Sequence, residues 1–118
     1  MNELDKLRKM LRDAGIPFED YQEKHPFYSE NAVLDSIKMY GPEASRYSRN
    51  QIIYGRNSED GMYWKFDAIC QYGSYGAKDG LIETYGELGV DSDGEPRVMT
   101  AKEAFKIIKN DWKKEKNK

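Results

Sequence analysis

This sequence contains few of the residues that build disulfides, metal sites or membrane spans. Its 118 residues include one cysteine, Cys70, and one histidine, His25. A single cysteine forms no intrachain disulfide, and a zinc site needs several cysteine or histidine ligands, so we expect no disulfide scaffold, no metal and no cofactor. No stretch approaches the roughly 18 consecutive apolar residues of a membrane span.

An excess of either charge is also absent. The chain has 19 basic and 21 acidic residues, for a net charge of −2. This near balance argues against bulk binding of nucleic acid, which usually requires a strongly basic domain. The N-terminal segment Met1–Lys6 contains acids where a signal peptide has a basic and then an apolar run. We therefore expect a cytoplasmic protein that does not contact membranes.

The apolar pattern predicts helices at both ends of a single domain spanning residues 1–118. Leu4, Leu7 and Leu11 form one stripe of a helix over residues 2–14. A capping box, Thr100 with Glu103 three residues later, opens a C-terminal helix that carries Phe105 and Ile108. We expect its basic tail, residues 113–118, to be frayed, and a further helix over residues 30–40.

The centre of the chain predicts a β-hairpin. Residues 48–54 and 62–70 read as strands around the turn Asp60-Gly61, with Trp64 and Phe66 on one buried face. Residues 81–85 are a candidate third strand or short helix, and residues 20–29 and 86–97 read as loops. The expected fold is α+β: a small three-stranded, mainly antiparallel sheet with two or three helices packed on one face. The expected core comprises Leu7, Leu11, Trp64, Phe66, Phe105 and Ile108.

No residue pattern indicates catalysis. Cys70 lacks an adjacent base in the sequence, and the acidic run Asp91–Glu95 lacks most ligands of a calcium loop. Spacing alone does not select Asp79 and Glu83 as an acid–base pair. We therefore expect a protein that binds a partner, not an enzyme.

The glycine-rich loop Tyr72–Gly80 is the strongest candidate site. Glycines let backbone N–H groups approach an anion, tyrosines offer faces for base stacking, and a lysine suits a phosphate. A purely structural connection explains the same residues equally well. The predicted ligand-binding residues are Tyr72, Gly73, Ser74, Tyr75, Gly76 and Lys78, with Arg46, Arg49 and Arg56 from the neighbouring hairpin.

Several segments resemble a family of small proteins carried by phages and prophages of Gram-positive bacteria. The resemblance rests on Ala14–Phe18, on Ser74-Tyr75-Gly76 followed by Gly80–Glu83, and on Met99–Ile108, which match "SYGG…GLLE" and "LTAEEVF" segments. It covers about two thirds of the chain, and residues 28–47 look like an insertion. The family is mostly hypothetical proteins, so the resemblance implies origin, and localisation in a host cell, more than activity.

These observations leave several functions open. The first hypothesis is a counter-defence sponge that sequesters a nucleotide second messenger. The alternative is a protein inhibitor that docks on a host defence protein, such as a CRISPR nuclease, without a small-molecule ligand. An enzyme that degrades such a signal is less favoured, and a virion or replication accessory factor remains open.

Apolar residues on both strand faces, including Ile53, Tyr63 and Ile69, predict a homo-oligomer.

Overall fold

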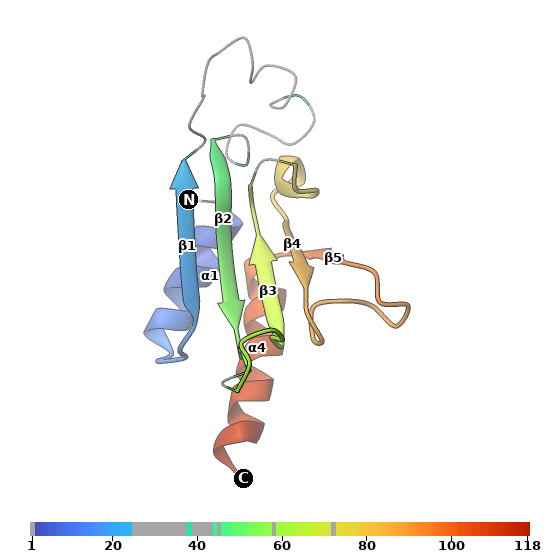
Figure 1. Cartoon of the computed structure of the whole chain (residues 1–118). Helices are drawn as coiled ribbons and strands as arrows, with labels where there is room; N and C mark the ends of the chain where they lie inside the picture. The colour runs from blue at the N-terminus through green and yellow to red at the C-terminus, as the bar shows by residue number, and fades with distance from the viewer. Residues whose placement is uncertain (1, 25–37, 39–43, 45, 58, 72) are drawn as a thin grey trace.

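The computed structural model describes residues 2–24, 38, 44, 46–57, 59–71 and 73–118. These residues form two α-helices and a five-stranded antiparallel sheet with strand order β1-β2-β3-β4-β5 (Figure 1). The α+β class is therefore confirmed, whereas the prediction of three strands is wrong. The elements are α1 (Glu3–Asp13), β1 (Glu19–Lys24), β2 (Tyr47–Tyr54), β3 (Phe66–Ile69), a 3-10 turn η1 (Ala77–Asp79), β4 (Ile82–Tyr85), β5 (Arg97–Met99) and α4 (Ala101–Lys116).

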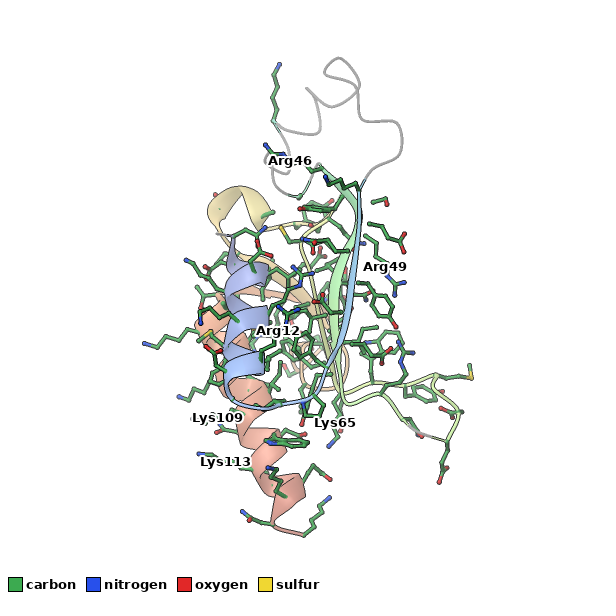
Figure 2. The ribbon with its side chains drawn as sticks, turned by 90° about the vertical axis from the view of Figure 1, so that its left-hand side faces the viewer. Arg12, Arg46, Arg49, Lys65, Lys109 and Lys113 are labelled. Atoms are coloured by element: carbon green, nitrogen blue, oxygen red, sulfur yellow. The ribbon has the colours of Figure 1, made fainter. Side chains whose placement is uncertain are left out.

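The two helices lie together on one side of the sheet (Figure 2). The Asn2 side chain caps α1, and the predicted Thr100–Glu103 capping box is present at the start of α4. The apolar stripes of both helices pack on the sheet around Phe66, which is fully buried. The main buried helix residues in this core are Leu4, Leu7, Leu11, Ala101, Ala104 and Ile108.

The two strands that sequence reasoning missed are the edge strands. β1 pairs only with β2, and β5 pairs only with β4. β1 (EDYQEK) lacks apolar alternation because Asp20, on its helix-side face, binds Arg8 instead of entering the core. β5 is three residues long, too short to show a period. The segment 20–29, expected to be a loop, thus contains most of β1. The segment 86–97, also expected to be a loop, leads into β5.

The predicted strand over residues 62–70 is shorter than expected and begins at Phe66. The Lys65 N–H is shared between the carbonyl oxygens of Tyr54 and Gly55, so regular pairing with β2 ends there. The Trp64 indole consequently donates to Asp67, on the face opposite to Phe66. The prediction that Trp64 and Phe66 share a buried face is wrong, and Trp64 is only partly buried.

Three other expectations concern residues 28–47, the C-terminal tail and membrane spans. Apart from Lys38, the predicted helix over residues 30–40 lies outside the described residues, as does most of the insertion 28–47. α4 continues to Lys116 and so includes most of the tail expected to be frayed. Within the described part, neither helix has the length and apolar character that crossing a membrane requires.

Candidate functional site

Neither of the two described helices covers the other face of the sheet, and we call it the open face (Figure 2). Strand register places alternate residues on this face, because neighbouring side chains of a strand point to opposite sides. Two residues that face each other on neighbouring strands therefore have their side chains on the same side of the sheet. Tyr21 faces Gln51 in this way, and Glu83 faces Val98. Its strand residues include Glu19, Tyr21, Arg49, Gln51, Ile53, Asp67, Ile69, Glu83, Tyr85 and Val98.

A chain of hydrogen bonds crosses the centre of the open face. Arg49 Nε donates to Gln51 Oε1 at 3.0 Å, and Gln51 Nε2 donates to Asp67 Oδ2 at 2.8 Å. The other oxygen of Asp67 accepts from Trp64 Nε1 at 3.0 Å. Asp67 is only 3% exposed, and its burial raises the pKa of the carboxyl even though both hydrogen bonds act to lower it. The centre of this face is thus a closed polar network.

A second carboxylate, Glu83, connects the open face to the glycine-rich loop. Its Oε2 accepts from the Tyr75 backbone N–H at 2.9 Å, and its Oε1 accepts from the Tyr85 hydroxyl at 2.6 Å. The hydrogen bond to Glu83, followed by burial, raises the pKa of Tyr85 to about 12. A backbone donor of the loop is therefore already bound to a carboxyl group of the same chain.

Two of the three predicted arginines, Arg49 and Arg56, have their contacts at β1 and the hairpin. The Arg49 guanidinium stacks on the Tyr21 ring, 3.8 Å from its centroid. Arg56 lies beyond the far end of β2, where its Nε is 2.5 Å from Glu19 Oε2 and Nη1 donates to the Gly61 carbonyl. The hydrogen bond from Arg56 holds the pKa of Glu19 below its usual value. Both arginines thus contact groups on or near β1 and the hairpin, not the loop before β4.

The remaining predicted site residues lie in or near the Tyr72–Gly80 loop. Gly73 and Gly76 have positive φ, and the Ser74 hydroxyl closes a turn by donating to the Gln71 carbonyl. A Cβ at Gly76 would be 3.0 Å from Val98, so the loop packs closely on the edge of the sheet. Tyr72 and the Lys78 side chain lie outside the described residues, and Arg46 is exposed just before β2. Ligand binding by this loop stays a prediction.

The β2–β3 hairpin, residues 55–65, extends away from the sheet on the side opposite to the helices (Figure 2). Met62 and Tyr63 in this hairpin are each 70% exposed. Beside them is a shallow depression of about 490 Å³, lined by Met62, Tyr63, Trp64, Gly86 and Glu87. Sequence reasoning noted Tyr63 as an outward apolar residue but did not select Met62, since an isolated methionine carries no motif.

The described residues include four large hydrophobic side chains that are substantially exposed. Tyr75 and Val98, at 65% and 46% exposure, join Met62 and Tyr63 in this group. Val98 lies on the open face opposite Glu83, and the Tyr75 backbone binds the Glu83 carboxylate. All four therefore lie on or beside the open face. By contrast Ile53, which suggested self-association, is 2% exposed and is covered within the chain.

The fold and this site define an α+β protein with a helical layer on one side of an antiparallel sheet and an aromatic, carboxylate-containing face on the other. Among the described residues, no group of three or more histidine, cysteine, aspartate or glutamate side chains is arranged to hold a metal ion. No protein-family model, curated protein or solved structure matches this chain.

Proposed function

We propose that this protein acts by docking on another protein through its open face, with the β2–β3 hairpin as the principal contact. The observation that carries this proposal is the collection of all four exposed large hydrophobic residues of the described chain on or beside one face. Met62 and Tyr63 are adjacent in the hairpin, and grouped exposed apolar residues mark interaction sites where singly scattered ones do not. Tyrosine and methionine are also enriched at protein interfaces.

The charges around the hairpin indicate the chemistry of the partner. Glu59, Asp60 and Glu87 are exposed close to Met62 and Tyr63 in the chain or around the depression. The nearby cation Arg56 is already paired with Glu19. The fitting partner surface is therefore an apolar pocket with basic residues at its rim. The resemblance to phage proteins makes a host defence protein a reasonable class of partner.

Sequestration of a nucleotide second messenger is the second candidate. It is favoured by the exposure of Tyr75 on a loop whose glycines adopt positive φ, a geometry suited to stacking and anion contacts. The bond from the Tyr75 N–H to Glu83 weighs against it, because a phosphate would have to displace a carboxylate that is 5% exposed. We therefore rank protein docking first.

One pair of variants separates the two candidates. The double substitution Met62→Ser and Tyr63→Ser removes the apolar tip of the hairpin, whereas Tyr75→Ala removes the predicted stacking ring. Host proteins that the parent captures should no longer be captured by the double variant. They should still be captured by a control double variant with Asn110→Ser and Lys114→Ser, which changes two exposed residues of α4. Binding to the purified captured protein should then fall at least tenfold for the double variant in a titration.

Nucleotide sequestration predicts a different result. Cyclic dinucleotides in excess would raise the melting temperature of the parent and of the double variant, since a ligand stabilises the folded state by RT ln(1 + [L]/Kd). Tyr75→Ala would lose that shift. This pattern, without a captured protein that depends on Met62 and Tyr63, would replace the docking proposal. Light scattering of the parent at micromolar concentration tests the predicted self-association: 13.7 kDa would indicate a monomer.

A further inference from the structure

Helix α4 carries a row of five lysines along its outer side. The spacing of four, three, four and three residues keeps them within about 80° of the helix circumference, given 3.6 residues per turn. At 1.5 Å per residue the row is about 21 Å long. Figure 2 shows two of its members, Lys109 and Lys113, on the side of α4 away from the sheet. The lysine row comprises Lys102, Lys106, Lys109, Lys113 and Lys116, all exposed.

The carboxylates of α4 do not neutralise this row. Glu103 is bound to Thr100 in the capping box, and Asp111 accepts from Lys65 Nζ at 3.0 Å. Glu115 pairs with Lys65 at 3.1 Å and with Lys118 at 3.0 Å. In the part of the chain that the structure describes, none of the five lysines of the row forms an ion pair with a carboxylate.

The basic residues of α1 differ from the lysine row in this respect. Lys6 pairs with Glu3, Lys9 pairs with Asp13, and Arg12 pairs with Asp20. Basic residues of the neighbouring helix are thus matched with acids, whereas those of α4 leave a positive field unopposed. The net charge of −2 conceals this separation because most of the acids lie outside α4.

We propose that the lysine row binds the phosphodiester backbone of duplex nucleic acid without sequence preference. Lysine ammonium groups are point charges that can contact any phosphate, and repeated phosphates match a row of such charges without a fixed register. A convex helix of this kind also fits the major groove of a duplex, which admits an α-helix. This site lies on the other side of the molecule from the proposed docking surface and does not depend on it.

Other polyanions fit the row less well. Single-stranded nucleic acid binds in grooves that have exposed aromatic rings. On α4, Phe105 and Trp112 are only partly buried. The Nζ atoms of Lys109 and Lys116 lie over these rings, 5.7 Å and 5.0 Å from their centroids. An anionic membrane would offer only electrostatic attraction, because the apolar side of α4, with Ala104 and Ile108, is buried against the core. The inferred ligand is therefore a duplex.

The test compares two triple variants that change the net charge equally. The row variant carries Lys106→Gln, Lys109→Gln and Lys113→Gln. The control variant carries Lys24→Gln, Lys114→Gln and Lys118→Gln, which are exposed positions outside the row. Binding of each purified protein to a mixed-sequence DNA duplex is titrated by fluorescence anisotropy at several salt concentrations, and circular dichroism verifies that each protein is folded.

The expected result follows from counterion release. If five lysines contact phosphates, doubling the salt concentration weakens parent binding about 20-fold, and two remaining contacts reduce this factor to about 3.5-fold in the row variant. The control variant should behave like the parent. The proposal is wrong if the folded parent does not bind the duplex at low salt, or if the row variant binds as the parent does. It is also wrong if the parent binds phosphatidylserine vesicles through the row but not the duplex.

Discussion

The two sides of this protein use charge and apolar surface in opposite ways. On the helix side, apolar residues are buried in the core and the lysines of α4 stay exposed and unneutralised in the described structure. On the open face, the carboxylates of Asp67 and Glu83 are buried and hydrogen-bonded, while large hydrophobic residues are exposed. The difference shows that one molecule of nearly neutral net charge presents two chemically unlike surfaces.

The largest expected effect tests which side holds the core. Phe66 is fully buried, whereas Met62, four residues earlier, is 70% exposed. Phe66→Ala should reduce the free energy of unfolding by about 3 to 5 kcal/mol, because it removes buried surface and leaves a cavity. Met62→Ala should change it by less than about 0.5 kcal/mol. Urea denaturation measures both, and similar losses at the two positions would contradict the contrast between the sides.

The next effect concerns the polar link between α1 and the sheet. Arg8 is 6% exposed and donates to Asp5, Asp20 and Asn50. Arg8→Ala should lower the unfolding free energy by about 2 to 3 kcal/mol. Breaking a fully buried ion pair costs about 3 to 5 kcal/mol, and the loss is smaller here because the two aspartates are partly exposed.

Arg12 provides the matched control for this link. It binds the same aspartate, Asp20, but its own side chain is 64% exposed. Arg12→Ala should therefore cost less than about 1 kcal/mol in the same chemical denaturation experiment. Equal losses for the two arginines would show that burial of Arg8 does not determine its contribution.

A smaller effect is expected at the start of α4, which positions the lysine row. Thr100 accepts a hydrogen bond from the Glu103 N–H in the capping box. Thr100→Ala should lower the unfolding free energy by about 1 kcal/mol. Ser92→Ala, in an exposed turn, should change it by less than about 0.5 kcal/mol. A thermal melt that does not distinguish these variants would rule out the cap as a determinant of this helix.

The smallest predicted effect is the pH dependence of the open face. Burial raises the pKa of Asp67 above its ordinary value of 3.8, so the folded state retains the proton to higher pH than the unfolded state does. Compared with Asp67→Asn, the parent should therefore lose stability as the pH rises from about 3.8 through the folded pKa. Comparing the parent with Asp67→Asn cancels the opposite pH dependence that Glu19, with its lowered pKa, gives to the stability of both proteins. Unfolding free energies at pH 3.5 to 7 measure this change, and a parent that gains stability relative to Asp67→Asn as the pH rises would contradict the assignment.

Local patterns in the sequence predicted the helices and the central hairpin. The leucine stripe of α1 and the capping box of α4 act between residues three or four apart, so they are visible in sequence alone. β2 was also predicted closely, because its three apolar residues Ile52–Tyr54 are adjacent. The edge strands escaped detection because pairing on one side only, with partners far along the chain, does not require a periodic apolar pattern.

The candidate site shows the same limit. The glycine-rich loop was recognisable by composition, but the contact of its Tyr75 N–H with Glu83 depends on how β3 and β4 pair. The predicted grouping of Arg56 with that loop assumed proximity along the chain, whereas strand β2 carries Arg56 to the opposite end of the sheet. The exposure of Met62 and Tyr63 likewise follows from the projection of the hairpin, which no motif encodes.

The sequence by itself determined the α+β class and the two terminal helices, because an apolar helical stripe depends on a local period of 3.6 residues. Only the tertiary structure decided which charges are neutralised and which apolar side chains stay exposed. Lys65 meets Asp111 across 46 positions of chain, whereas the lysine row of α4 has no acidic partner in the described structure. Such matches depend on distances in space, for which sequence separation carries no information.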